Sequence, residues 1–114
     1  MSTILVVADQ PDIRRTLCQI YLQGGFVVLE AEDSATAFTL AQENPFDMVM
    51  LGLQPTESAL QICSRFAHEY KAPILYLTTI EYIDTVLNAG ANDVIITPHA
   101  RLLAETLMDG ASAS

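Results

Sequence analysis

Five short apolar runs limit what this chain can fold into more than any other feature of its sequence. They begin at residues 4, 26, 48, 74 and 94, so successive starts lie 22, 22, 26 and 20 residues apart. Each run is continuous rather than alternating, which is typical of strands buried on both faces. The sequence therefore predicts five buried strands joined by long connections. The runs are Ile4–Val7, Phe26–Leu29, Met48–Leu51, Ile74–Leu77 and Val94–Ile96.

The connections between these runs carry apolar residues at helical spacing. Between the third and fourth runs, for example, Ala59, Ile62 and Phe66 follow the order i, i+3, i+7 and share one face of a helix. The last two helices are expected to be shorter than the others and to cover Tyr82–Ala89 and Ala100–Met108.

Residues at the ends of the connections support the helices. Asp33 or Ser34 can cap the second helix and Thr56 the third, because their side-chain oxygens accept hydrogen bonds from first-turn amides. Gly24 and Gly25 are in place to end the first helix before the second strand.

Strand and helix alternate five times, which predicts an α/β fold with a parallel sheet and helices on both faces. We expect a flavodoxin-like three-layer sandwich with strand order 2-1-3-4-5 and five helices. In such a sheet a ligand site lies beyond the carboxyl ends of the strands, where strands 1 and 3 meet.

The composition excludes several classes of protein. A chain of 114 residues that is 51% hydrophobic and 17% charged is not disordered and has no room for two ordinary domains. We expect one domain over residues 1–109 and a flexible tail over residues 110–114. The net charge of −9 argues against nucleic-acid and anionic-membrane partners, since both would repel the protein. It is compatible with a basic partner or a divalent cation.

The sequence favours a cytoplasmic location. Its amino terminus has no basic region, and its apolar stretches are far shorter than the ~20 residues of a membrane helix. Cys18 and Cys63 form no metal-binding or redox pair in the sequence, and both fall in apolar helical patterns, so we expect buried thiols.

The residues around the strand ends resemble those of a known family. The stretches ILVVADQPDIRR, GGFVVLEAEDSATAF, PFDMVMLGLQP, APILYLTT and AGANDVIITP, in this order, are similar to the receiver domain of response regulators in two-component signalling. The resemblance covers about residues 3–108. It implies a flavodoxin-like fold and a site built from an acidic pair, a phosphoacceptor Asp, a hydroxyl and a Lys before Pro.

Several of these positions depart from the family pattern. The acidic pair is Ala8 and Asp9, and the phosphoacceptor position is Gly52. The hydroxyl is retained as Thr78, whereas the Lys position is Thr97, followed by the family's Pro98. We also expect the Thr97–Pro98 peptide bond to be cis, as the resemblance implies.

These changes alter the chemistry of the pocket. Aspartyl phosphorylation needs a carboxylate nucleophile, which Gly52 lacks. A carboxylate about 4 Å from Mg²⁺ supplies roughly 8 kcal/mol of gross attraction at an effective dielectric near 20, before desolvation. Only Asp9 remains of three such groups, so we expect no cofactor and weak or absent Mg²⁺ binding, with Asp9 as a weak metal candidate.

The resemblance and its departures together predict a pseudo-receiver. This would be a non-enzymatic protein-interaction module whose output does not depend on phosphorylation and whose partner is a signalling kinase or an output domain. One alternative is a flavodoxin-like domain that binds a small ligand beside Gly52. Another is a receiver phosphorylated at a non-standard residue such as Asp9.

The resemblance also implies an interaction surface over helix 4, strand 5 and helix 5. In this chain the surface would carry apolar residues that could serve partner binding or a homodimer. These residues are Ile80, Tyr82, Ile95, Leu102 and Met108.

Overall fold

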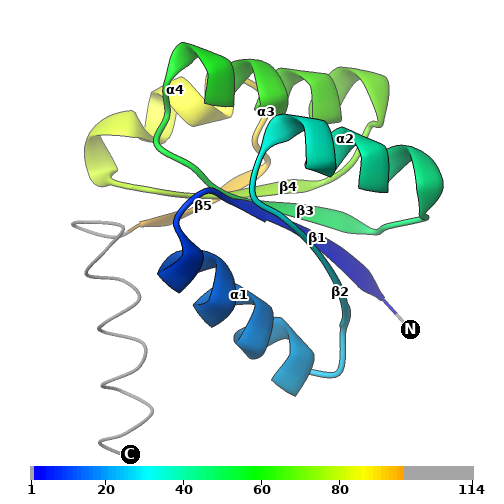
Figure 1. The fold of residues 1–114 in the computed structure, drawn as a ribbon. Helices are drawn as coiled ribbons and strands as arrows, with labels where there is room; N and C mark the ends of the chain where they lie inside the picture. The colour runs from blue at the N-terminus through cyan, green and yellow to red at the C-terminus, as the bar shows by residue number, and fades with distance from the viewer. Residues whose placement is uncertain (1, 97–114) are drawn as a thin grey trace, which may run out of the picture.

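The computed structural model describes residues 2–96 and shows strands alternating with helices along the chain (Figure 1). The strands are β1 (Thr3–Ala8), β2 (Val27–Ala31), β3 (Met48–Gly52), β4 (Ile74–Thr78) and β5 (Asp93–Ile96). The helices of this region are α1 (Pro11–Gln23), α2 (Ser34–Glu43), α3 (Glu57–Glu69) and α4 (Ile83–Asn88), and a short 3-10 turn, η1 (Ile80–Tyr82), precedes α4.

All five strands are parallel and lie in the order β2-β1-β3-β4-β5. The predicted flavodoxin-like fold and strand order are therefore confirmed. The fifth helix, expected over Ala100–Met108, and the expected tail lie outside the described residues.

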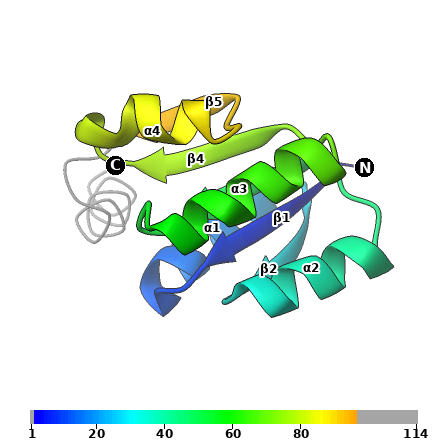
Figure 2. The same ribbon diagram turned by 90° about the horizontal axis from the view of Figure 1, so that it is seen from above.

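The helices cover both faces of the sheet. Figures 1 and 2 show α2, α3 and α4 on one face and α1 on the other. Because side chains alternate along a strand, β1 contributes side chains to the apolar cores on both faces of the sheet. Leu5 and Val7 pack toward α2 and α3, whereas Ile4 and Val6 pack toward α1.

The prediction that all five runs are buried on both faces was wrong for β2 and β5. These strands form the two edges of the sheet, and four of the five residues of β2 and all four of β5 keep some exposure. Val27 is 41% exposed and Ile96 is 44% exposed. The three central strands are buried as expected, since they have a strand on each side as well as helices on each face.

The helix ends follow the predicted capping chemistry. The side chain of Asp33 accepts from the Thr36 amide at 2.8 Å, and that of Thr56 accepts from the Ala59 amide at 3.2 Å. After α1, Gly25 adopts a positive φ of 89°. A left-handed residue of this kind directs the chain from the helix into β2.

The fourth helix is short, as predicted, but is divided in two. The expected helix over Tyr82–Ala89 is observed as α4, and its expected first residue, Tyr82, ends η1. At its carboxyl end Gly90 has a φ of 122°, while the Gly90 and Ala91 amides donate to the carbonyls of Leu87 and Val86. These bonds satisfy the last carbonyls of the helix and fix where it ends.

Both cysteines are free and buried, as expected. Cys18 packs in the layer of α1 and Cys63 in the layer of α3, so the sheet separates the two thiols. Within residues 2–96, none of the helices has the length and apolar character needed to cross a membrane.

Candidate functional site

The carboxyl ends of β1 and β3 place two of the predicted site residues side by side. Ala8 and Gly52 are register partners at the ends of these strands, and both are buried. Thr78 ends the next strand, β4, and is 4% exposed. The structure thus brings Ala8, Gly52 and Thr78 to one edge of the sheet.

The position of Gly52 is closed by neighbouring apolar side chains. A Cβ on Gly52 would lie 3.3 Å from Leu17 Cδ1, 3.4 Å from Ala8 Cβ and 3.4 Å from Ile13 Cγ2. Leu17 and Ile13 belong to α1, so this helix covers the place where a phosphoacceptor side chain would begin. A side chain at this position would therefore begin in contact with apolar groups.

Asp9 follows β1 and is exposed. It is the only carboxylate among the three acidic positions expected from the family. Within residues 2–96, no group of three or more His, Cys, Asp or Glu side chains is arranged to hold a metal ion. Mg²⁺ prefers several oxygen ligands in octahedral geometry. The donors present at this edge of the sheet therefore do not fit the metal that the family pattern implies.

Thr97, Pro98 and the predicted cis bond between them lie outside the described residues. Of the expected pocket, the structure therefore places Ala8, Asp9, Gly52 and Thr78.

Arg14 ties α1 to the end of β1 and to β2. Its Nη1 donates to the Ala8 carbonyl at 2.9 Å, and its Nε lies 3.4 Å from Glu30 Oε1. The Arg14 side chain is only 15% exposed, so the guanidinium is held in place. The contact could not be predicted from the sequence, because it depends on how α1 packs against the two strands that flank it in the chain.

A shallow hollow of about 240 Å³ lies beside α1 on the β2 side, away from Gly52. Cys18 lies in this region and its thiol donates to Glu30 Oε2 at 3.5 Å. Burial and the neighbouring Glu30 carboxylate raise the pKa of Cys18 to about 12, so the thiol stays protonated and unreactive at neutral pH. The lining residues are Pro11, Arg14, Arg15, Cys18, Gln19, Leu22 and Glu30.

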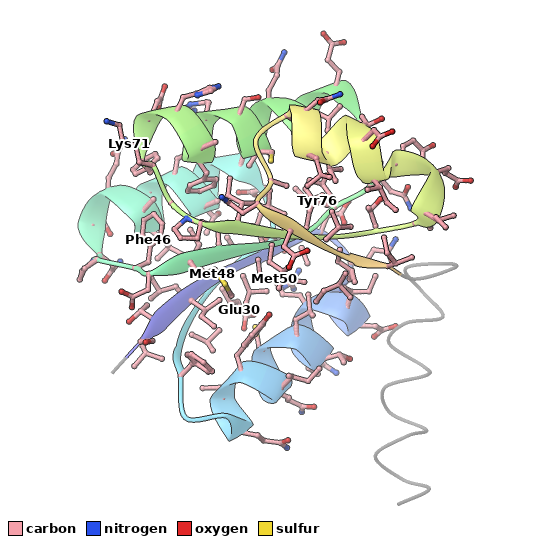
Figure 3. The ribbon with its side chains drawn as sticks, turned by 180° about the vertical axis from the view of Figure 1, so that it is seen from behind. Glu30, Phe46, Met48, Met50, Lys71 and Tyr76 are labelled. Carbon is pink, nitrogen blue, oxygen red and sulfur yellow. The ribbon has the colours of Figure 1, made fainter. Side chains whose placement is uncertain are left out.

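Tyr76 is a feature that the sequence did not reveal. Its ring is fully buried in β4, and its hydroxyl has no hydrogen-bond partner among residues 2–96. Figure 3 shows Tyr76 on the side of the sheet that α4 covers, and Met48 and Met50 on the side of α1. Burial raises the pKa of Tyr76, so its hydroxyl is uncharged.

The predicted interaction surface is only partly exposed. Ile80 is 72% exposed and Tyr82 is 38% exposed, but Ile95 is half-buried against the layer of α1. Leu102 and Met108 lie outside the described residues.

Comparison with known proteins identifies the family of this chain. The profile of the response regulator receiver domain matches residues 4–107. This chain belongs to the receiver-domain family of response regulators.

Two named relatives of this receiver domain come from Bacillus subtilis and Staphylococcus aureus. It is 32% identical over 113 residues to the uncharacterized transcriptional regulatory protein YrkP of Bacillus subtilis, covering 90% of this chain and 48% of YrkP. It is 31% identical over 101 residues to the transcriptional regulatory protein SrrA of Staphylococcus aureus, covering 85% of this chain and 42% of SrrA. The chain thus spans about half the length of these relatives.

Solved structures share the fold. The response regulator TrrA of Thermotoga maritima, solved in complex with Mg²⁺ and BeF, superposes with a TM-score of 0.75 at 26% identity, covering 96% of this chain and 98% of that one. The chemotaxis response regulator CheY4 of Vibrio cholerae gives a TM-score of 0.73 at 27% identity, covering 99% and 98%. Receiver domains serve two-component signalling.

Proposed function

We propose that this receiver domain is a pseudo-receiver: a non-enzymatic protein-interaction module whose output does not depend on aspartyl phosphate. The observation that carries the proposal is Gly52 at the phosphoacceptor position, covered by Leu17, Ile13 and Ala8. A phosphoryl group needs a nucleophile, and Gly52 supplies none.

The metal part of the site supports the same function. Asp9 is the single acid left from the family set, and a divalent cation must shed water to bind it. We propose that this domain binds no cofactor and holds Mg²⁺ weakly or not at all.

We also propose a protein partner, such as a signalling kinase or an output domain, that the module meets in the cytoplasm. The net charge of −9 disfavours nucleic acid and anionic membranes as direct partners. The two unpaired thiols, separated by the sheet, suit a reducing compartment.

The test is an amide NMR titration of the labelled domain with acetyl phosphate, and separately with beryllofluoride, each with Mg²⁺. We expect no saturable shifts at Asp9, Gly52 or Thr78. Intact-mass measurement of the same samples should show no phosphoryl adduct. A receiver domain that retains the family's acidic pair, phosphoacceptor Asp and Lys serves as the positive control.

Saturable shifts centred on Asp9 and Thr78 would refute phosphorylation independence. An adduct that maps to Asp9 would support the alternative of a receiver phosphorylated at a non-standard residue. Flavin or nucleotide that purifies with the protein would support the small-ligand alternative, which the closed contacts around Gly52 disfavour.

A further inference from the structure

The edge of the sheet at β2 carries unpaired backbone groups. β2 pairs with β1 alone, and the Val27 amide donates to the Ser2 carbonyl at 2.9 Å. Because bonding direction alternates along a strand, the N–H and C=O groups of Val27 and of every second residue after it face β1. The backbone groups of Val28 and Glu30 therefore point away from the sheet, where no other strand of the described region meets them.

The side chains along this edge are mostly apolar and accessible. Val27 is 41% exposed, while Val28 packs toward α1 and Leu29 toward α2, both half-buried. Leu22, 57% exposed, lines the hollow beside the edge. β2 contains no Pro, Lys or Arg, the residues that commonly keep an edge strand from pairing. The edge is thus open to a further strand.

The charges at this edge are of both signs. Glu30 is the one acid of β2, and its Oε1 lies 3.4 Å from Arg14 Nε, on the side of the sheet that α1 covers (Figure 3). Arg15 is exposed, lines the same hollow and forms no ion pair within residues 2–96. A surface that carries an acid beside an unpaired cation is complementary to a copy of itself.

We infer that two copies of this domain pair through their β2 edges, antiparallel, about a two-fold axis at Leu29. In this register Val28 of each copy faces Glu30 of the other, and each such pair exchanges two backbone hydrogen bonds. The outward groups of both residues are then satisfied. The hollow leaves room on the α1 side, where Arg15 can approach Glu30 of the second copy. The pairing does not depend on the function proposed above.

The opposite edge of the sheet suits a second copy less well. β5 begins with the exposed Asp93, and residues 72–96 contain no Lys, Arg or His to balance it. Two β5 edges would therefore bring like charges together. Charge thus favours β2 as the edge that pairs with itself.

The first test is sedimentation velocity of the full chain over a range of protein concentrations. The contact is small and each copy carries a net charge of −9, so we expect a weak dimer with a dissociation constant of about 10⁻⁴ M. Added salt screens the repulsion between the copies and should strengthen the dimer.

Amide hydrogen exchange identifies the edge that pairs. In the monomer the amides of Val27 and Leu29 should exchange slowly, because they donate to β1, and those of Val28 and Glu30 should exchange fast. Above the dissociation constant, exchange at Val28 and Glu30 should slow several-fold.

Cysteine cross-linking tests the register. Leu29→Cys places two thiols across the axis, where the Cα atoms of a non-hydrogen-bonded antiparallel pair lie about 4.5 Å apart, within disulfide range. Val27→Cys is the matched control, because the two copies of residue 27 would be offset by at least about 13 Å. Under a mild oxidant Leu29→Cys should form a disulfide-linked dimer at least about tenfold faster than Val27→Cys. The wild type, whose own thiols are buried, should form none.

Charge and backbone variants complete the test. Arg15→Glu should weaken the dimer several-fold, whereas Lys71→Glu, the same charge change at an exposed residue away from β2, should alter it less than about twofold. Val28→Pro removes an outward N–H without touching the bonds to β1 and should abolish the dimer. Thermal unfolding checks that each variant folds.

Three results would overturn the inference: a monomer at millimolar concentration, equal cross-linking of Leu29→Cys and Val27→Cys, and concentration-dependent protection away from β2. If the domain stays monomeric while a synthetic peptide of residues 26–32 binds at β2, the occupant is an extended segment of another protein, which also overturns it. These measurements use no phosphoryl donor, so their outcome leaves the proposed function unchanged.

Discussion

Gly90 lies directly against Ala67: a Cβ on Gly90 would come within 2.6 Å of the Ala67 Cβ. Gly90 also has a φ of 122°, which side chains rarely tolerate. This contact lets the end of α4 approach α3 closely.

Gly90→Ala should therefore destabilise the domain by about 3 kcal/mol, combining backbone strain with overpacking. Urea denaturation followed by circular dichroism measures the change. Gly25→Ala is the matched control, because Gly25 also has a positive φ but would meet nothing within 4 Å. We expect it to lower the unfolding free energy by only about 1 kcal/mol. Equal losses in the two variants would show that the contact with Ala67 is unimportant.

Gly52→Asp should lower stability and should not restore phosphorylation. The new carboxylate would begin among Leu17, Ile13 and Ala8, and an unpaired buried charge or a shifted helix costs about 2–4 kcal/mol. Gly52→Ala separates size from charge: its methyl is tight but uncharged, so we expect a change below about 1 kcal/mol. Urea denaturation measures the change in stability. Intact-mass measurement after incubation with acetyl phosphate detects any phosphorylation. A stable Gly52→Asp that gains a phosphoryl adduct would contradict the closed site.

Tyr76→Phe should leave stability unchanged or raise it by about 1 kcal/mol. The Tyr76 hydroxyl is buried without a partner, and an unsatisfied polar group is unfavourable by about 1–3 kcal/mol. Removing it keeps the ring and the packing. Tyr82→Phe, at an exposed residue, is the control and should have no effect. If Tyr76→Phe instead destabilises the domain, the hydroxyl has a partner such as a bound water.

Asp33 should make stability depend on pH in the acid range. Its carboxylate accepts from the Thr36 amide, and this bond lowers the pKa of Asp33 from its ordinary 3.8. A lowered folded pKa means that the stabilisation is fully present above the unfolded value and is lost as pH falls through the folded value. Asp33→Asn keeps a capping oxygen but does not titrate there. The difference in melting temperature between the two proteins should therefore shrink below about pH 4, and a constant difference would contradict this cause.

Much of the fold follows from short-range patterns. The continuous runs predict the strands, and Asp33 and Thr56 predict where α2 and α3 begin, because capping depends on residues three positions apart. The exposed edges were missed because a run such as Val94–Ile96 looks the same in the middle of a sheet and at its edge. Which strand lies outermost depends on the topology, not on the run itself.

The candidate site, too, could be predicted from the sequence only in part. Which residues stand at the strand ends could be predicted, because the apolar runs mark where each strand stops. The closure of Gly52 by Leu17 and Ile13 could not, because it depends on how α1 sits on the sheet. The unpartnered hydroxyl of Tyr76 is also invisible in sequence: the residue counts as apolar within its run, and only the surrounding side chains decide whether its oxygen finds a partner.

Because α1 covers Gly52, the domain could not readily acquire a phosphorylatable aspartate at this position. Replacing Gly52 by aspartate would first place an uncompensated charge among apolar side chains. A second acid or a lysine that could balance this charge would still be missing. Each intermediate on the way back would be less stable than the present fold and still inactive. The apolar contacts of Leu17 and Ile13 with the strand ends would therefore oppose the return of an aspartate at this position.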